Sequence, residues 1–275
     1  MSDRTVLITG CSSGIGRASA YAFLDEEWRV YATARNPADI ERLGEAGCDI
    51  GTIDVTDPAD VERVVGRIVE EEGRIDALVN NAGHGQIGPL EDVRDDLLRA
   101  QFDVDVFGPH RLVREVLPHM RERGDGTIVN VSSVAGRLAP PGMGAYAASK
   151  HAMEGYSDAL RREVAPLGVD VSVVQPGPVK TRFRETAREE LGRLERTEVY
   201  ADLYEFQEDA SLLGADSPIA IHPAEVAEAI VEAAVSTDPE PRYVVGRVAQ
   251  VLVYASYLPD PIADVAFEAV RKFTS

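Results

Sequence analysis

Cysteine and lysine are scarce in this sequence. Its two cysteines, Cys11 and Cys48, are far too few for the disulfide framework of a small secreted protein. Lys150, Lys180 and Lys272 are the only lysines, and the remaining basic residues are arginines. Because 47 acidic residues stand against 28 basic ones, the formal net charge is −19. Such a surface repels phosphate backbones and anionic headgroups, which argues against a nucleic-acid-binding protein.

Long hydrophobic runs are also missing. The longest candidate, Val248–Pro259, is interrupted by Gln250 and Ser256 and is too short to cross a bilayer. The amino-terminal sequence MSDRTVLITG leads directly into a strand pattern and lacks the features of a signal peptide. We therefore predict a cytoplasmic protein with no transmembrane segment.

The excess of acidic residues has two interpretations. It suits a halophilic protein, because screening at very high salt weakens the repulsion between surface carboxylates. It also suits an acidic mesophilic enzyme from a GC-rich genome. The composition leaves both open.

Strand-like and helix-like segments alternate along the chain. Several of the strand segments are apolar throughout, as in strands buried on both faces. This alternation predicts an α/β fold, a doubly wound parallel sheet of the Rossmann type with about seven strands. The predicted strands are Thr5–Thr9, Arg29–Ala34, Ile50–Asp54, Asp76–Asn80, Thr127–Ser132, Val169–Gln175 and Arg242–Val245. The predicted helices are Ala18–Glu27, Pro37–Glu45, Pro58–Glu72, Asp95–Arg123, Gly144–Pro166 and Ala224–Ser236.

No Pro- or Ser-rich linker divides the chain, which favours a single domain over residues 1–275. Residues 182–217 break the alternation with a charged, mixed sequence, and we predict a helical substrate lid there. A solvated surface insertion is the alternative. Residues 247–275 form a C-terminal extension. Its run Val248–Phe273 is expected to join a subunit interface, with a membrane-surface role as the alternative.

A glycine-rich turn follows the first predicted strand, over Thr9–Gly16. Glycines allow the backbone to turn sharply and to approach a pyrophosphate, and a helix N-terminus presents free N–H groups to it. The strand–turn–helix context therefore predicts a dinucleotide site, although an ordinary glycine turn remains the alternative. At the end of the second strand stand Arg35 and Asn36, with no acidic residue before Asp39. A guanidinium there can pair with a 2′-phosphate, so NADP(H) is favoured over NAD(H).

Tyr146 and Lys150 lie four residues apart on a predicted helix and hence on one face of it. A hydride delivered to a carbonyl leaves an alkoxide that must be protonated, and a free tyrosine is too weakly acidic for this at neutral pH. A neighbouring ammonium lowers the pKa of a phenol. The pair is therefore a candidate acid/base site, the alternative being a tyrosine and a lysine on a surface helix.

Several motifs occur in the order and near the separations seen in the short-chain dehydrogenase/reductase family. The glycine spacing T-G-x-x-x-G-I-G resembles the three-glycine form of that family. The other motifs are Asp54-Val55, Asn80–Gly83, Tyr146–Lys150 and Pro176–Thr181. Together they cover roughly residues 5–181, and the region beyond matches only loosely. The stretch Phe102–Leu112 and the Ala-Arg-Asn after the second strand look most like the steroid and retinol dehydrogenase branch.

The resemblance implies a role for each motif in cofactor binding. Asp54 would bind the adenine amino group and Val55 would offer a backbone contact. Asn81 to Gly83 would line the adenosine ribose, while Val179 and Thr181 would hold the nicotinamide carboxamide. The full set assigned to the cofactor is Gly10, Ser12, Ser13, Gly14, Ile15, Gly16, Arg35, Asn36, Asp54, Val55, Asn81, Ala82, Gly83, Tyr146, Lys150, Pro176, Gly177, Val179 and Thr181. No metal ligand is assigned.

The resemblance also implies a catalytic set of Ser133, Tyr146 and Lys150. Ser133 would bind the substrate oxygen, Tyr146 would transfer the proton, and Lys150 would hold the nicotinamide ribose and acidify Tyr146. The chain departs from the family at Asp105, where many members have a catalytic Asn whose carbonyl holds a relay water. Asp105 can keep that backbone role, and its charge would pair with Lys150 and perturb the site.

These observations predict an oxidoreductase that interconverts an alcohol and a ketone or aldehyde, with NADP(H) as cofactor. A catalytically weak NADP(H)-binding sensor is the alternative that Asp105 favours, and epimerisation on the same scaffold is a third. The candidate pocket residues are largely apolar, which suits an apolar small-molecule substrate. They are His84, Gln86, Val134, Leu138, Met143, Phe183, Tyr200, Tyr204 and Phe206. A homodimer or homotetramer is expected, because helices corresponding to Asp95–Arg123 and Gly144–Pro166 pair across a two-fold axis in related enzymes.

Overall fold

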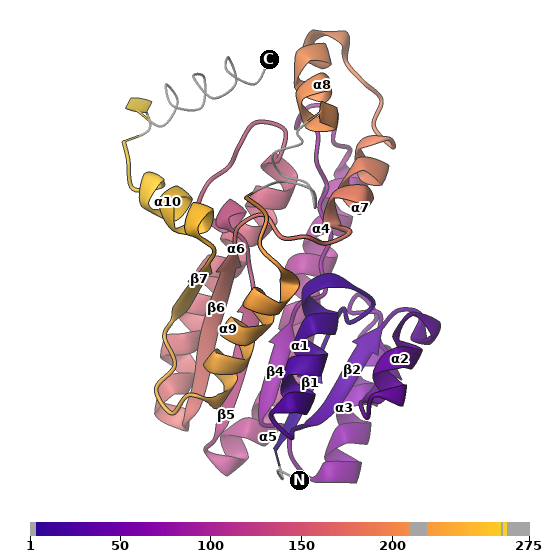
Figure 1. The fold of residues 1–275 in the computed structure, drawn as a ribbon, viewed down its shortest axis with the longest axis vertical. Coiled ribbons are helices and arrows are strands. Elements are labelled where there is room, and N and C mark those ends of the chain that lie inside the picture. The colour runs from indigo at the N-terminus through magenta and orange to yellow at the C-terminus, as the bar shows by residue number, and fades with distance from the viewer. Residues whose placement is uncertain (1–3, 210–218, 260, 263–275) are drawn as a thin grey trace.

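The chain folds around a seven-stranded parallel sheet with the strand order β3-β2-β1-β4-β5-β6-β7 (Figure 1). The structure is a computed structural model, and it describes residues 4–209, 219–259 and 261–262. The strands are β1 (Thr5–Ile8), β2 (Arg29–Ala34), β3 (Asp49–Thr52), β4 (Ala77–Asn80), β5 (Gly126–Val131), β6 (Val169–Pro176) and β7 (Arg242–Val245). The order reverses between β1 and β4, and the predicted doubly wound, Rossmann-type sheet is confirmed.

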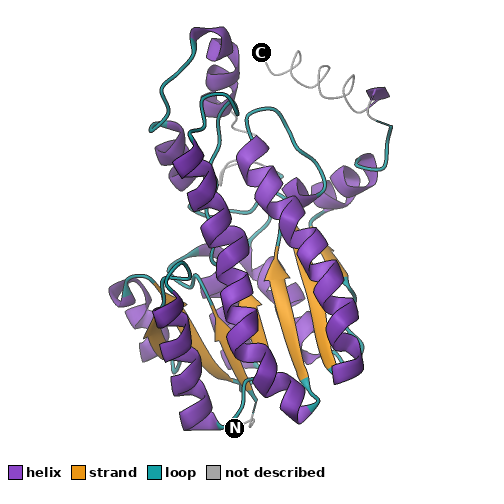
Figure 2. Cartoon of the chain, turned by 180° about the vertical axis from the view of Figure 1, so that it is seen from behind, coloured by secondary structure: helices purple, strands orange, loops and turns teal. Residues whose placement is uncertain are grey.

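Helices cover both faces of the sheet, and each face has its own hydrophobic core (Figures 1 and 2). On one face lie α1 (Gly14–Asp25), α2 (Glu41–Glu45) and α9 (Pro223–Val235). On the other lie α3 (Pro58–Glu72), α5 (Gly108–Arg123) and α6 (Gly144–Val164). Adjacent strand residues point to opposite faces, so the fully apolar strands supply both cores.

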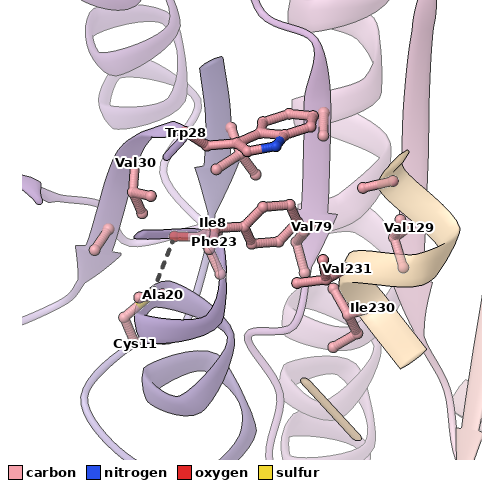
Figure 3. Packing of buried hydrophobic residues seen from close by; sticks show 14 of the residues in the cluster. Ile8, Cys11, Ala20, Phe23, Trp28, Val30, Val79, Val129, Ile230 and Val231 are labelled. Carbon is pink, nitrogen blue, oxygen red and sulfur yellow. Dashed lines mark hydrogen bonds between the residues drawn. The ribbon is translucent and has the colours of Figure 1, made fainter. Parts of the chain in front are cut away.

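Figure 3 shows the core between the sheet and the α1–α9 layer. Phe23 of α1 and Trp28 meet edge to face, with ring centroids 5.2 Å apart. Ile8 and Val79 from the central strands pack in the same cluster as Ile230 of α9. These side chains fix α1 on the sheet, and with it the turn that precedes the helix.

The long helix predicted over Asp95–Arg123 is interrupted. It consists of α4 (Asp95–Phe102), a π-helical turn (Asp103–Phe107) and α5 (Gly108–Arg123). Single π turns inside helices recur at functional sites, and this one carries Asp105. The predicted helical stretch is therefore confirmed over its whole length, while the π turn within it was not foreseen, because the sequence of the turn is compatible with either hydrogen-bonding pattern.

Residues 182–217, predicted as a helical lid, contain α7 (Phe183–Leu191) and α8 (Ala201–Asp209), and residues 210–217 lie outside the described part. Figure 1 places both helices beyond the carboxyl ends of the strands. Buried Asp92 anchors the segment by accepting hydrogen bonds from Thr197 N at 3.1 Å, Thr197 Oγ1 at 2.6 Å and the Tyr204 hydroxyl at 2.6 Å. This segment is thus tied to the loop that follows β4.

The C-terminal extension predicted over 247–275 begins with α10 (Arg247–Ala255), and residues 260 and 263–275 lie outside the described part. Val251, Tyr254 and Tyr257 expose most of their side chains to solvent. Within the described residues, no helix has the length and apolar character that a membrane crossing requires.

Candidate active site

The turn between β1 and α1 is shaped by three glycines. Gly10 and Gly14 have left-handed backbones, with φ of +73° and +55°. At Gly16 a Cβ would lie 2.4 Å from the carbonyl oxygen of Gly10, so no larger residue fits. The structure therefore contains the sharp turn and the close backbone approach that a dinucleotide pyrophosphate needs.

The N-terminus of α1 opens onto this turn. Ser13 is the N-cap residue, and its side chain makes no capping hydrogen bond. The first N–H groups of the helix are thus left for an anion, together with the positive end of the helix dipole. Ser12 and Ile15 complete the turn on either side and are partly exposed. This arrangement fits the pyrophosphate of a dinucleotide.

Asn81 ties the glycine turn to the end of β4. Its amide nitrogen donates to the carbonyl oxygens of Thr9 at 2.9 Å and Gly10 at 3.1 Å. The Thr9 hydroxyl in turn accepts from the backbone N–H groups of Asn81 and Ala82, both at 3.1 Å. These bonds hold the two central strand ends in register, at the point where the strand order reverses.

The residues assigned to the adenosine half lie along the ends of β2 and β3. Arg35 is exposed directly after β2, and the Asn36 side chain caps the following turn by accepting from Ala38 N at 3.3 Å. Asp54 Oδ1 accepts both the N–H and the hydroxyl of Thr56, at 2.9 and 2.7 Å. The Val55 carbonyl accepts from Arg111 at 3.2 Å. Asp54 and Val55 are therefore held in fixed orientations.

Arg17 is a cation of this region that the sequence reasoning missed. Its guanidinium donates to the carbonyl oxygen of Ser12 in the glycine turn, and to that of Asp39 at 2.9 Å. It therefore links the glycine turn to the loop after β2 that carries Arg35. The sequence signal that could have pointed to Arg17 is its position directly after Gly16, the last glycine of the turn.

The loop after β6 reaches over the glycine turn from the other side. Gly177 N donates to Val245 O at 3.1 Å, and Val179 forms a parallel bridge with Ile221. Pro176 ends β6, so the chain leaves the sheet here. A Cβ on Gly14 would lie 2.8 Å from the Thr181 methyl carbon. Thr181 is thus positioned beside the glycine turn, and Val179 is held against Ile221 two residues earlier.

Tyr146 and Lys150 lie one turn apart on α6, and both are buried. Lys150 Nζ lies 5.6 Å from the centre of the Tyr146 ring and donates to the Val131 carbonyl at 3.2 Å. Ser133 follows β5, and its side chain lies close enough to the phenol to lower the pKa of Tyr146. The Ser133 hydroxyl also accepts from Ala135 N at 3.1 Å. The three predicted catalytic residues are therefore brought together at the carboxyl edge of the sheet.

Burial and charge act in opposite directions in this cluster. Burial raises the pKa of Tyr146, the Lys150 ammonium lowers it, Asp105 raises it and the Ser133 hydrogen bond lowers it. The net pKa of the phenol is above its usual value. Burial alone would lower the pKa of Lys150, but Asp105 and Tyr146 raise it above its usual value. The lysine therefore stays charged and the phenol protonated at neutral pH.

Asp105 lies directly beside this pair. Its side chain is completely buried, and Oδ2 lies 3.3 Å from Lys150 Nζ. The Ser149 hydroxyl hydrogen-bonds Oδ2 at 3.0 Å, and the backbone N–H of His84 lies 3.4 Å from Oδ1. At Gly83 a Cβ would lie 3.0 Å from Oδ1 and 3.6 Å from Lys150 Nζ. Gly83 therefore borders the acid–base cluster.

Phe183, the first residue of α7, covers the phenol. Its ring centroid lies 5.1 Å from that of Tyr146, and a Cβ on Gly85 would overlap the ring at 2.4 Å. Other candidate pocket residues are engaged elsewhere. The buried Gln86 side chain donates to the Ile87 carbonyl at 3.0 Å, and the Tyr204 hydroxyl donates to Asp92. Of the predicted pocket aromatics, Phe183 is the one that the structure places against Tyr146.

Several known proteins are similar to this chain in sequence. The family model described as short chain dehydrogenase matches residues 4–192. The oxidoreductase YbbO of Escherichia coli K12 is 41% identical over 188 residues, which cover 68% of this chain and 70% of that protein. The 3-ketodihydrosphingosine reductase of Bacteroides thetaiotaomicron is 36% identical over 277 residues, covering 98% of this chain and all of the relative.

Solved structures show the same relationship. A short-chain dehydrogenase from Streptomyces avermitilis aligns over 100% of both chains, with a TM-score of 0.83 and 34% identity. A Burkholderia phymatum enzyme in complex with NAD has a TM-score of 0.74 and 28% identity, covering 85% of this chain and 87% of its own. A metagenomic oxidoreductase in complex with NADP has a TM-score of 0.69 and 25% identity, covering 88% and 96%.

Proposed function

Because the chain belongs to the short-chain dehydrogenase/reductase family, we propose that it is an NADP(H)-dependent oxidoreductase that interconverts an alcohol and a carbonyl compound through Ser133, Tyr146 and Lys150. One observation carries the proposal. The Ser133 hydroxyl and the Lys150 ammonium converge on a buried phenol, at the strand edge that also holds the glycine turn.

A bound reduced nicotinamide supplies the hydride to the carbonyl carbon. The Ser133 hydroxyl orients the carbonyl oxygen and stabilises the charge that develops on it. The Tyr146 O–H bond breaks as its proton moves to that oxygen, which leaves a phenolate. Lys150 stabilises the phenolate by its charge. In the oxidative direction the same phenolate takes the proton of the alcohol, so one site serves both directions.

Two arginines support NADP(H) over NAD(H). Arg35 is exposed at the end of β2, where a 2′-phosphate would lie, and Arg17 bridges the adjoining loop and the glycine turn. Solved relatives bind either NAD or NADP, so relatedness alone selects neither. The two positively charged guanidinium groups attract the negatively charged 2′-phosphate and therefore favour NADP(H).

The substrate is proposed to be an apolar ketone or the corresponding alcohol. Phe183 and partly buried Met143 place apolar surface around Tyr146. One relative that aligns along its whole length is named 3-ketodihydrosphingosine reductase. A lipid-derived ketone is therefore the first substrate class to test.

A catalytically weak NADP(H) sensor remains a second candidate, and the buried Asp105–Lys150 ion pair is the observation that favours it. In that case the unmodified protein would bind NADPH but turn over no carbonyl substrate. Asp105→Asn, which keeps the shape of the side chain, would then restore activity.

The test combines a substrate panel with Tyr146→Phe. NADPH consumption is followed by its absorbance with long-chain ketones, cyclic ketones and aldehydes. The variant retains the ring but has no proton to give, so turnover should fall by about 10²–10⁴-fold while NADPH still binds. Tyr156→Phe is the matched control, because Tyr156 lies on the same helix and its hydroxyl meets His110 at 3.2 Å, outside the site. Unchanged turnover in Tyr146→Phe would refute the mechanism.

A further inference from the structure

A carboxylate with no exposed surface faces the acid–base pair. The Asp105 side chain is fully buried and lies 3.3 Å from the Nζ atom of Lys150, a residue that is itself buried. Asp105 belongs to the π turn between α4 and α5, whereas Lys150 belongs to α6. A buried charge is stable only when it is paired and hydrogen-bonded. The two side chains therefore require each other for burial.

The ammonium of Lys150 is held from two sides. It donates to the Val131 carbonyl at 3.2 Å, and the charge of Asp105 Oδ2 faces it from 3.3 Å. Because lysine carries three N–H donors, donors remain for a cofactor hydroxyl or the phenol. Ser149 fixes the carboxylate in turn, since its hydroxyl lies 3.0 Å from Oδ2.

We propose, building on the function proposed above, that Asp105 is a positioning residue: its carboxylate holds the Lys150 ammonium against the end of β5 and offsets part of that ammonium's effect on Tyr146, which favours the proton-donating phenol and hence carbonyl reduction. Reduction needs the O–H bond of Tyr146, whereas oxidation needs the phenolate. A negative charge behind the lysine works against the phenolate. The site is therefore set for reduction at neutral pH, and oxidation requires alkaline conditions.

The groups that face Lys150 from each neighbouring element support an effect of the Asp105 charge on the Lys150–Tyr146 pair. Asp105 faces it from the π turn, Tyr146 and Glu154 from its own helix, and the Val131 carbonyl from β5. The charge of Glu154 is already balanced, because Arg242 lies 3.0 Å from one of its oxygens and Gln175 donates to the other at 2.8 Å. Among the described residues Asp105 forms its ion pair with Lys150, so its charge acts chiefly on the Lys150–Tyr146 pair.

Asp105→Asn tests the proposal, because it removes the charge and keeps the shape. The basic limb of the pH profile of kcat/KM for NADPH-dependent reduction should move about one pH unit lower. Oxidation with NADP+ at neutral pH should rise by up to about tenfold, because the phenolate fraction at a fixed pH grows about tenfold when the phenol pKa falls by about one. Asp105→Ser, which places a smaller uncharged residue there, should move the basic limb of reduction and the rate of oxidation in the same directions as Asp105→Asn.

Asp103→Asn is the matched control. Asp103 stands on the same π turn, but its carboxylate is partly exposed and pairs with Arg111 at 2.7 Å rather than with Lys150. Removal of the Asp103 charge should leave the basic limb of reduction and the rate of oxidation at neutral pH unchanged. A purely structural role of Asp105 predicts a lower melting temperature and lower activity with unmoved limbs, and that outcome overturns the proposal.

A second readout is independent of turnover. The Tyr146 phenolate can be titrated by its ultraviolet absorbance in the cofactor-free protein, with Tyr146→Phe as the reference. The titration should move to lower pH in Asp105→Asn. If no variant reduces any carbonyl compound, the proposed oxidoreductase function fails, and the titration alone decides the role of Asp105. Coincident titrations with and without Asp105 would contradict the inference.

Discussion

Two guanidinium groups flank the loop after β2. Arg35 was predicted from its place at the strand end, where many dinucleotide enzymes carry an acid for the ribose hydroxyls. Arg17 was not predicted, because its function follows from the fold, which carries its side chain from α1 to the carbonyls of Ser12 and Asp39. At this edge of the sheet, the sequence therefore predicts a side chain that stands at a strand end. It does not predict a side chain that reaches from a helix to the carbonyl groups of another loop.

Arg35→Asp should change the choice of cofactor. Losing a charge-assisted bond to the 2′-phosphate costs about 1.5–3 kcal/mol of binding free energy, and the new carboxylate favours a ribose hydroxyl. NADPH affinity should fall and the preference should move toward NADH, as measured by the dissociation constants of both. Arg42→Asp, an equal charge change at an exposed position of α2, should leave the ratio unaltered. Equal affinities for the two cofactors in the unmodified protein would remove the basis for assigning NADP(H).

At the scale of elements, the carboxyl ends of β1, β4, β5 and β6 bring together the glycine turn, Asn81, Ser133 and the loop of Thr181. The sequence predicts this convergence because parallel strands place their carboxyl ends at one edge. The π turn at Asp103–Phe107 could not be predicted, since its residues fit a continuous helix equally well. The role of Asp92 in anchoring residues 197–204 was also missed, because its partners Thr197 and Tyr204 lie more than a hundred residues away.

Asp76 joins three elements at the opposite edge of the sheet. It is buried, it accepts from Thr5 N at 2.7 Å, and it pairs with Arg74 at 2.5 Å and Arg123 at 2.6 Å. Burial alone would raise the pKa of Asp76, but the bonds from Arg74 and Thr5 and the charge of Arg123 hold it below its usual value. Its ionised form is therefore the one that stabilises the fold.

Asp76→Asn should lower the free energy of unfolding by about 2–3 kcal/mol at pH 7, the scale of lost charge-assisted hydrogen bonds. Because the pKa of Asp76 is lower in the folded than in the unfolded protein, its contribution to stability is complete above the unfolded pKa of about 3.9. This contribution is lost as the pH falls through the folded pKa. The difference in the free energy of unfolding between Asp76→Asn and the unmodified protein should therefore shrink below about pH 4. Urea unfolding at several pH values measures it. Asp125→Asn, at an exposed carboxylate 3.2 Å from Arg123, should cost under about 1 kcal/mol.

For the molecule as a whole, the outer faces of α5 and α6 are the predicted subunit interface. A surface depression there is lined by His110, Leu117 and Tyr156, among others, and Phe107 at the start of α5 is half exposed. A two-fold axis through this face would bring identical helices together. The family resemblance favours a dimer, and the depression combines apolar side chains such as Leu117 with charged ones such as Arg114 and Glu163. The exposed side chains of Val251 and Tyr254 on α10 are the candidate second contact for a tetramer.

Light scattering at high salt should therefore give the mass of a dimer or a tetramer. Leu117→Glu should reduce the mass toward that of a monomer, because it places a charge inside the apolar contact. Tyr21→Glu puts the same charge on the exposed side of α1 and should leave the assembly intact. A monomeric mass for the unmodified protein would rule the interface out.

The net charge of −19 predicts a dependence of stability on salt. Screening weakens the repulsion between surface carboxylates, so the melting temperature should rise between low and molar KCl if the composition reflects adaptation to salt. Sucrose at matched viscosity serves as the uncharged control. A melting temperature that stays constant with KCl would mean that the acidic composition has no role in stability.

Amine-directed reagents will meet very few targets on this protein. Lys150 is only 6% exposed, whereas Lys180 stands exposed on the loop after β6, and Lys272 lies outside the described residues. Arginine does not react with active esters at neutral pH, and both cysteines are buried. A dye or solid support coupled through Lys180 would therefore sit beside the loop assigned to the nicotinamide. An introduced surface cysteine would provide an attachment point away from that loop.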